Sequence, residues 1–300
     1  MYIYTGAALK SLPAPLPLPS YFTRMGIVKS FRSFAERLGG SVMDKVCRVG
    51  EFGYFVAQML RWLTTRLPCK GTILPCFYQI GVQSLPVVAL TGTFIGMVLA
   101  VQSYTQLKSL GMETRMGALI NMSLVRELGP VLAATMLAGR IGSSMAAELG
   151  TMRVTEQIDA LTCMGTNPIH YLVVPRFLGC LLLIPILALM ADFMGIVGGA
   201  FYSVYLLGID SHYYISNSQS FVGLYDISSG IFKSFFFGAA IGVISCYRGF
   251  NCRAGAEGVG RAATEAFVNS FVAILLLDLL MGIFLEALHS MIWAGNAKLF

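Results

Sequence analysis

The longest uncharged stretch of the chain spans residues 71–107 and reads GTILPCFYQIGVQSLPVVALTGTFIGMVLAVQSYTQL, with Lys70 before it and Lys108 after it. As one helix these 37 residues would measure about 55 Å, whereas the hydrocarbon core of a bilayer is about 30 Å thick. The stretch therefore predicts a membrane span over about residues 85–107, preceded by a half-buried approach near Pro75.

The composition is typical of a chain that is embedded in a membrane. Of its 300 residues 56% are hydrophobic and 12% are charged, whereas soluble proteins carry about 25% charged residues. Ten of the 21 Lys and Arg residues precede residue 71, so this basic part can meet anionic lipid headgroups. A soluble fold is excluded on this ground, and a nucleic-acid partner is not expected.

Outward from the first span, further apolar stretches predict spans at about residues 116–138, within 177–209, at about 227–247 and at about 266–293. We expect an all-α polytopic membrane protein with about five transmembrane helices. Glycines four residues apart favour close helix packing, and they occur at Gly92/Gly96, Gly195/Gly199 and Gly238/Gly242.

The first seventy residues differ from the rest. Residues 1–20 read as a flexible, Pro-rich lead, and the PAPLPLP run at residues 13–19 interrupts any secretory signal. Over residues 21–70 apolar side chains recur at helical spacing with basic side chains on another face, which predicts amphipathic helices in the membrane interface. A soluble surface helix is the alternative. The basic, acid-poor start leaves an organelle inner envelope membrane as an alternative location to a cell inner membrane.

The distribution of Lys and Arg in the loops predicts an orientation. The loop at residues 210–226 has no Lys or Arg, whereas the loop at residues 248–262 has three Arg. Basic loops stay in the cytoplasm. We therefore expect the N-terminus and the loops at residues 144–176 and 248–262 to be cytoplasmic and the C-terminus to be outside.

Residues 139–168, between the second and third predicted spans, are too polar to cross a bilayer. Thr155 can cap a short helix whose first turn carries Glu156, and Gly165 and Pro168 can end it. The pattern predicts a cytoplasmic helix at residues 155–165, able to receive force from a partner. An ordinary amphipathic connector is the alternative.

Arg126 and Glu127 lie near the middle of the second predicted span, where each costs about 2.5–3.5 kcal/mol on insertion scales. Such residues face protein or a wet cavity. Arg126 is a candidate for binding a lipid headgroup, and a buried polar clamp between helices is the alternative. Arg140, fourteen positions later, is expected on nearly the same helix face, and Gly129-Pro130 is expected to kink the span.

The chain shows no catalytic signature of its own. No Lys-Ser or Lys-Thr pair follows the Gly-x-x-x-x-Gly of a P-loop, and neither HExxH nor GxSxG occurs. The seven Cys residues form no CxxC pair, and no two of the three His residues are four positions apart. We expect no metal, no cofactor and no enzymatic activity in this subunit.

One stretch carries a specific resemblance. Residues 125–161 read VRELGPVLAATMLAGRIGSSMAAELGTMRVTEQIDAL, and MGTNPIHYLVVPR follows from residue 164. This resembles the MlaE (YrbE) permease family, the membrane subunits of ABC transporters that move phospholipids between membranes. The resemblance covers about residues 45–295, so a five-span permease domain is expected over residues 71–295, with its coupling segment at residues 144–168.

The resemblance implies partners and site residues. It implies a homodimer, a cytoplasmic ABC ATPase, an outer MCE-domain lipid-binding protein, a STAS-type accessory protein and a phospholipid substrate. It places Arg126 and Glu127 beside a lipid pocket, for which the first span offers an apolar wall of Leu90, Phe94, Met97 and Val101. It likens one segment to the helix that docks on the ATPase, namely Glu156, Gln157, Ile158, Asp159 and Leu161.

A second interpretation stays open at this point. A self-contained ion-coupled transporter or channel would use the charged residues within the spans as its polar path and would need no ATPase. Those residues are Arg126, Glu127, Asp192 and Asp278.

Overall fold

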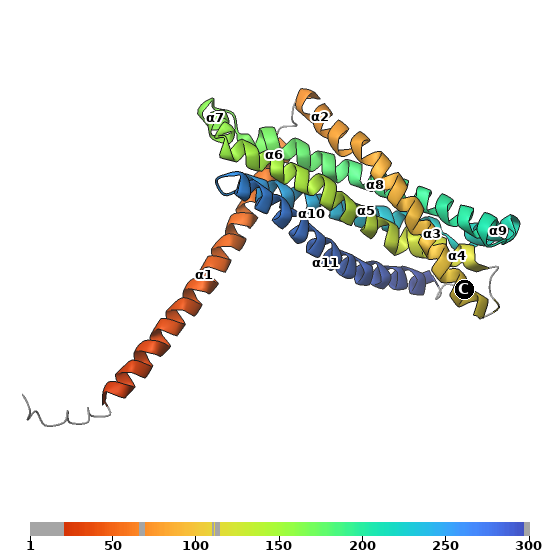
Figure 1. The fold of residues 1–300 in the computed structure, drawn as a ribbon, viewed down its shortest axis with the longest axis horizontal. Helices are drawn as coiled ribbons and strands as arrows, with labels where there is room; N and C mark the ends of the chain where they lie inside the picture. The colour runs from red at the N-terminus through yellow and green to blue at the C-terminus, as the bar shows by residue number, and fades with distance from the viewer. Residues whose placement is uncertain (1–20, 66–69, 110, 112–114, 297–300) are drawn as a thin grey trace, which may run out of the picture. The chain divides into compact units, whose positions relative to one another are not determined.

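A computed structural model describes residues 21–65, 70–109, 111 and 115–296, so the predicted lead at residues 1–20 lies outside the described residues. Every regular element in the described part is a helix, which confirms the all-α prediction (Figure 1). The chain divides into two compact units, residues 1–54 and 55–300. In the first unit the structure describes one feature, the greater part of helix α1 (Tyr21–Thr65).

The last turns of α1 belong to the second unit, where they are packed. Phe55 and Met59 are buried in a cluster with Leu149, Ile158 and Phe177. These contacts explain why α1 continues past residue 54 as a helix, since an amphipathic helix gains most of its stability from burial of its apolar face. The placement of residues 21–70 in the membrane interface stays a prediction.

Four helical segments of the second unit are long and apolar enough to cross a membrane, namely Gly71–Ser109, Ile169–Leu206, Leu224–Phe250 and Ala256–Leu288. They correspond to the predicted first, third, fourth and fifth spans. They are built from α2 (Lys70–Ile80), η1 (Val82–Ser84), α3 (Leu85–Ser109), η5 (Ile169–Val173), α8 (Val174–Phe201), η6 (Tyr202–Leu206), α10 (Leu224–Phe250) and α11 (Ala256–Asn296). The predicted approach near Pro75 is α2.

The second predicted span is part of a longer helical rod. The rod joins α4 (Met116–Ser123), η3 (Leu124–Leu128), α5 (Gly129–Leu137), η4 (Ala138–Gly142) and α6 (Ser143–Val154). It runs beside α8 and α10 through the bundle (Figure 1). Arg126, Glu127 and Arg140 make this rod more polar than the four long apolar segments described above. Residues 139–154, predicted as part of the connector, are the end of this rod.

Glycines bring the helices into close contact, as their spacing predicts. A Cβ added to Gly96 would lie 1.9 Å from the Gly195 carbonyl oxygen, and one added to Gly92 would lie 2.6 Å from that of Ala191. A Cβ on Gly238 would lie 2.7 Å from the Cys180 carbonyl oxygen. The backbones of α3 and α10 therefore approach that of α8 at positions where no larger side chain fits.

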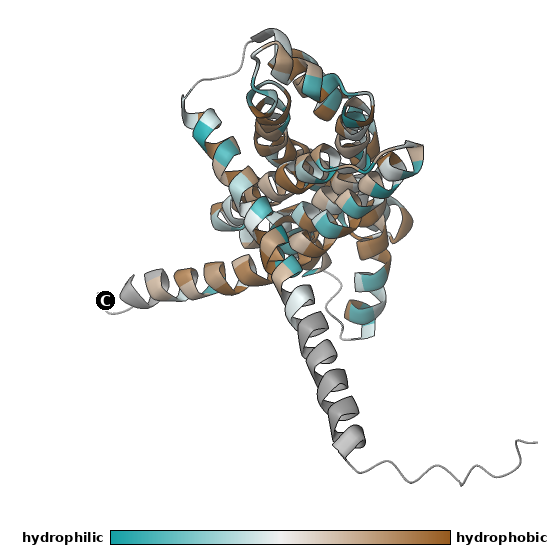
Figure 2. Ribbon diagram, turned by 90° about the vertical axis from the view of Figure 1, so that its left-hand side faces the viewer, coloured by the Kyte–Doolittle hydropathy of each residue, from teal (hydrophilic) through white to brown (hydrophobic). Residues whose placement is uncertain are grey.

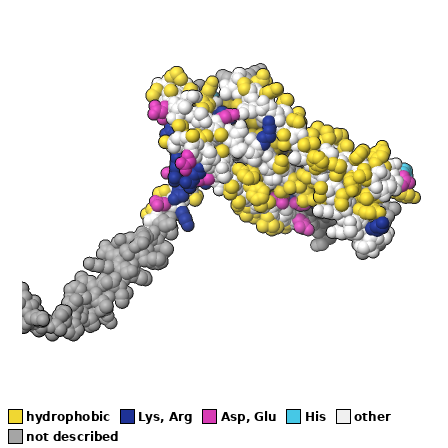
Figure 3. Space-filling model, in the orientation of Figure 1, with side chains coloured by type: hydrophobic (Ala, Val, Ile, Leu, Met, Phe, Trp, Pro, Cys, Tyr) yellow, Lys and Arg dark blue, Asp and Glu magenta, His cyan; other side chains and the backbone are white. Residues whose placement is uncertain are grey.

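The second unit has two distinct ends. The short helix α7 (Gln157–Cys163) and the loop between α10 and α11 lie at one end, and α9 (Ser211–Phe221) and the end of α11 lie at the other (Figure 1). Hydrophobic side chains cover most of the visible surface between the ends (Figure 3), and α11 is hydrophobic along most of its length (Figure 2).

Helix α9 covers the end of the rod. Asp210 caps it by accepting a hydrogen bond from the His212 backbone N–H at 2.9 Å. Asn121 on α4 donates to the Ser218 hydroxyl at 2.9 Å, and Tyr214 is buried between the two helices. Burial raises the pKa of the Tyr214 hydroxyl above its usual value.

Candidate functional site: a charged pocket within the helix bundle

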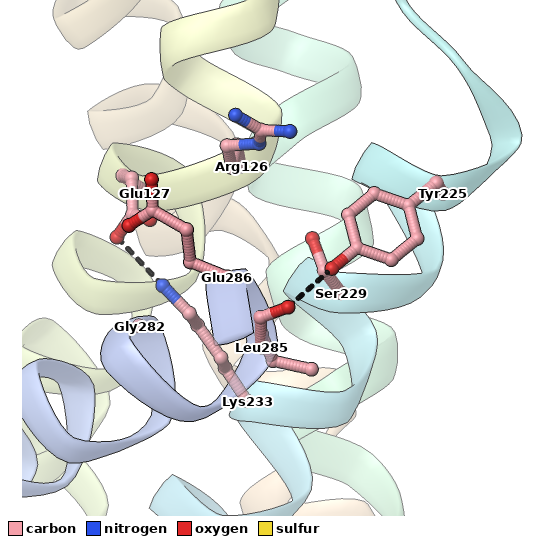
Figure 4. Close-up of a pocket in the computed structure, with 8 residues that line it drawn as sticks. All are labelled: Arg126, Glu127, Tyr225, Ser229, Lys233, Gly282, Leu285 and Glu286. Atoms are coloured by element: carbon pink, nitrogen blue, oxygen red, sulfur yellow. Dashed lines mark hydrogen bonds and ion pairs between the residues drawn. The ribbon is translucent and has the colours of Figure 1, made fainter. Parts of the chain in front are cut away.

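A pocket of about 310 Å³ lies between the rod, α10 and α11. Its walls combine charged, polar and apolar groups, and Figure 4 shows them converging from three helices. The lining residues are Arg126, Glu127, Tyr225, Ser229, Lys233, Gly282, Leu285 and Glu286. Arg126 and Glu127, the two residues singled out in the second span, are both among them.

Lys233 on α10 is the centre of an ion-pair network. Its Nζ donates to Glu127 Oε2 at 2.6 Å and to Asp278 Oδ1 at 3.2 Å, so one ammonium joins the rod to α10 and α11. The Lys233 side chain is 1% exposed, whereas that of Glu127 is 47% exposed. A buried ammonium is costly unless it is paired, and two carboxylates offset that cost here.

Arg126 makes a separate ion pair. Its Nε donates to Asp226 Oδ1 at 3.0 Å, and Asp226 Oδ2 accepts from the Gly223 backbone N–H at 3.0 Å. Asp226 therefore caps α10 and holds Arg126 at once. Within the described residues the two terminal guanidinium nitrogens of Arg126 have no partner, and its side chain is 38% exposed. These nitrogens remain able to bind a ligand in the pocket.

The local backbone explains how Arg126 and Glu127 reach the same pocket. Residues 124–128 form a wide π turn, directly before Gly129-Pro130. Pro130 has no N–H to give to the preceding turn, and π turns occur often at functional sites. Here the predicted irregularity at Gly129-Pro130 takes the form of a π turn. Both side chains thus line one cavity without pairing with each other.

Asp192 on α8 lies elsewhere. It is 7% exposed, its Oδ1 has no hydrogen-bond partner in the described residues, and it does not line the pocket. A Cβ on Gly129 would fall 1.6 Å from that oxygen, so Gly129 leaves the space that Asp192 occupies. Asp278, by contrast, joins the network at Lys233.

The apolar wall predicted on the first span is not part of this pocket. Leu90, Phe94 and Val101 are 60%, 54% and 43% exposed on α3, and Met97 is half-buried. Their spacing of four, three and four residues puts them in one stripe on the helix surface. Their contact with a transported lipid stays a prediction.

Arg140 does not share the face of Arg126, and that prediction was wrong. Arg140 lines a second cavity beside α2, whereas Arg126 faces α10 and α11. The two π turns at residues 124–128 and 138–142 explain the difference. Each adds a residue to a turn, so the regular 3.6-residue register that the prediction assumed does not hold between them.

The predicted coupling segment contains α7, which has an exposed polar side and a buried apolar side. Glu156, Gln157 and Asp159 are exposed. Ile158 is 2% exposed in the hydrophobic cluster that contains Phe55 and Met59, and Leu161 packs against that cluster. Asp159 accepts from Arg153 Nη1 at 2.6 Å.

The predicted cap of this helix was wrong. Thr155 donates its hydroxyl to the Thr151 carbonyl and ends α6, while Glu156 precedes α7 with φ of 59°. The sharp turn between α6 and α7 takes the place of a cap, because a left-handed residue redirects the chain within one position.

Comparison with known proteins identifies the family. The permease MlaE family matches residues 73–284, which is well over half of the chain. The chain belongs to the MlaE permease family.

Relatives within the MlaE family come from bacteria and from a plant. A probable ABC transporter permease of Rickettsia felis is 47% identical over 83% of this chain and 96% of the relative. The intermembrane phospholipid transport system permease MlaE of Haemophilus influenzae is 35% identical over 83% of this chain and 96% of the relative. The chloroplastic protein trigalactosyldiacylglycerol 1 of Arabidopsis thaliana is 38% identical over 75% of this chain and 64% of the relative.

The charged pocket of this MlaE family member contains residues that sequence reasoning did not select. Lys233 and Asp226 complete its three ion pairs, and Tyr225, Ser229 and Glu286 line it. The signal for Lys233 was present, because a charge inside a predicted span marks a buried or functional site. Asp226 lay at a predicted loop end, where an acid is ordinary.

Proposed function

We propose that this chain is the membrane permease subunit of an ABC transporter that moves phospholipids between membranes, with ATP hydrolysis in a separate subunit. The observation that carries the proposal is a pocket with exposed charge inside the membrane-spanning bundle of an MlaE family member. The proposal is supported by the relatives, a probable ABC transporter permease in Rickettsia felis and an intermembrane phospholipid transport permease in Haemophilus influenzae.

The pocket suits a phosphate-bearing headgroup. The free terminal nitrogens of Arg126 can fork to two phosphate oxygens. Glu286 presents a carboxylate on the same cavity, where it can meet the ammonium of a zwitterionic headgroup. We therefore assign Arg126 to the phosphate. Glu127 we assign to the shape and gating of the pocket, because a carboxylate repels phosphate.

The ion-coupled channel is less well supported. Such a path needs charged groups that line one continuous route, yet Asp192 is buried away from the pocket beside Gly129. Asp278 and Glu127 are both engaged by Lys233. Glu127 and Asp278 thus act mainly as contacts between helices, and Asp192 does not join them in one route.

The partners follow from the same proposal. The exposed acids and amide of α7 (Glu156, Gln157 and Asp159) are the docking edge for the ATPase, and Ile158 anchors α7 to the bundle. A second copy of the chain, an MCE-domain protein on the outer side and a STAS-type protein complete the transporter. The protein is multi-pass in a cell inner membrane, with the end that carries α7 in the cytoplasm.

The test is ATP-dependent lipid movement. The permease, co-purified with its proposed ATPase and MCE-domain partners, is reconstituted in liposomes with a fluorescent phospholipid. We expect transfer that needs ATP and stops when the Walker lysine of the ATPase is replaced. Transfer that persists without the ATPase would support the self-contained transporter instead.

The role of Arg126 is tested in the same preparation. Arg126→Ala should lower the lipid co-purified per permease more than Arg126→Lys does, with the melting temperature unchanged. Asp226→Asn is the matched control, because it removes the partner of Arg126 but leaves the cation. If Arg126→Ala and Asp226→Asn both lower the melting temperature and the bound lipid, Arg126 is a clamp and has no headgroup role.

A further inference from the structure

A second, smaller cavity opens on the other side of the rod. It measures about 100 Å³ and lies between α2, η1 and the η4–α6 part of the rod. Four polar side chains line it, those of Gln79, Gln83, Arg140 and Ser144. Since about 10–15 Å³ holds one water molecule, the cavity has room for a phosphate group.

Arg140 brings an unbalanced positive charge to this cavity. Its side chain is half-buried, and among the described residues no carboxylate lies within ion-pair distance of it. Among the described residues, Arg140 donates from Nη1 to the hydroxyl of Ser84, which is fully buried and donates in turn to the Ile80 carbonyl. The Ser84 contact fixes one nitrogen of the guanidinium and leaves its other donors for an anion.

The nearest acid along the rod does not neutralise Arg140. Glu148, two turns farther along the rod, accepts from Arg176 Nη2 at 3.1 Å and also from the Gln79 amide. Glu148 is therefore paired with Arg176, and its backbone lies about 12 Å along the rod from that of Arg140. A charged arginine in a membrane protein is costly to hold without an anion, and among the described residues no carboxylate lies within ion-pair distance of Arg140.

The position of Arg140 indicates which anion can reach it. Arg140 lies about 21 Å along the rod from Arg126, toward the end that carries α7. On the same α2–η1 segment, Tyr78 and Val82 border an apolar groove of about 400 Å³ that α8 closes with Leu183 and Ile186. A lipid whose chains cover this surface brings a phosphodiester to the depth of Arg140.

We propose that the cavity at Arg140 is a second phosphate site, which binds the phosphodiester of a membrane lipid near the α7 end of the bundle. Gln83 and Ser144 supply neutral donors beside the arginine. Because Arg140 and Arg126 both lie in π turns of one rod, the two cavities place two phosphate sites at different depths of the membrane. The site stands on its own geometry and does not depend on the transport activity.

The experiment is site-specific photocrosslinking in nanodiscs of phosphatidylcholine and phosphatidylglycerol. Val82→p-benzoylphenylalanine places the reactive group on the groove beside the cavity, and mass spectrometry measures the lipid adduct. We expect Arg140→Gln to lower the adduct about tenfold, the effect of losing one charged hydrogen bond. Arg140→Lys should retain part of it, and Arg126→Ala should leave it unchanged, which separates this site from the charged pocket.

Two controls decide between a lipid site and a structural contact. Arg153→Gln removes a cation from the same rod outside the cavity and should leave the adduct unchanged. Ser84→Ala removes the structural bond but keeps the charge, and it should preserve most of the adduct. An adduct that persists in Arg140→Gln, or that Ser84→Ala abolishes equally, overturns the proposal. Competition by inorganic phosphate in the buffer would show a free-phosphate site and overturn the lipid assignment.

Discussion

At Lys233 one ammonium group holds three helical segments together. Glu127 comes from the rod and Asp278 from α11, and both carboxylates bond to Lys233 on α10. With its side chain 1% exposed, Lys233 has no access to water that could replace either partner. The residue therefore stabilises the wall of the pocket and does not itself bind ligand freely.

Replacing Lys233 should destabilise the fold. Lys233→Met leaves Glu127 and Asp278 facing each other without a cation, and breaking a buried pair in this way costs about 3–5 kcal/mol. The measurement is the melting temperature of the detergent-solubilised protein. Adding Asp278→Asn should recover part of the loss. Arg261→Met, which removes an exposed pair with Glu265, is the control and should cost at most about 1 kcal/mol. An unchanged melting temperature in Lys233→Met would contradict the network.

At the scale of elements, the contact between α3 and α8 depends on glycine. The Gly96 site faces the Gly195 backbone, where no flexible side chain can move aside. Helices in lipid associate mainly through such close packing, because the hydrophobic effect does not distinguish a helix from a lipid chain.

Gly96→Ala should therefore separate the two helices. Overpacking of this kind costs about 1–3 kcal/mol, and more where the opposing atoms are backbone. Gly260→Ala on α11 is the matched control, since nothing lies within 4 Å of its added Cβ. Thermal unfolding of both variants in the same detergent measures the difference. Equal melting temperatures would show that α3 and α8 tolerate a wider separation.

Helix α7 presents its charges outward, so its docking role can be separated from its fold. Glu156→Lys with Asp159→Lys inverts the charge of the exposed edge and should release the ATPase in co-purification while the permease keeps its melting temperature. Glu257→Lys, an exposed acid in the first turn of α11 at the same end of the bundle, is the control. Arg153→Ala controls for the lost ion pair with Asp159. A complex that survives the double inversion would show α7 to be only a connector.

At the scale of the whole molecule, the two ends of the second unit can be assigned to the two sides of the membrane. Residue 219 is exposed on α9 and residue 256 is exposed at the start of α11, at opposite ends of the bundle. In a chain whose seven native Cys are replaced, Gln219→Cys should react with an impermeant maleimide from outside. Ala256→Cys should react only after the membrane is opened. The reverse pattern would invert the orientation.

The sequence by itself determined the class of protein and most of its spans. Long uncharged stretches can only be helices in a bilayer, because every backbone polar group must find its partner within the segment. Glycines four residues apart predicted close helix packing, and the structure identified α8 as the helix that they approach. The stretch from Val125 to Leu161 determined the family, since its residues are specific over many positions.

Only the tertiary structure decided which charges meet. Arg126 and Asp226 are a hundred positions apart, and Lys233 joins residues from the rod and from α11, so no local pattern contains these pairs. The π turns decided that Arg126 and Arg140 face different cavities, because they break the regular period on which a helical projection depends. The direction of a side chain in a bundle depends on the twist of every helical turn before it and on the packing around it, and both exist only in the folded chain.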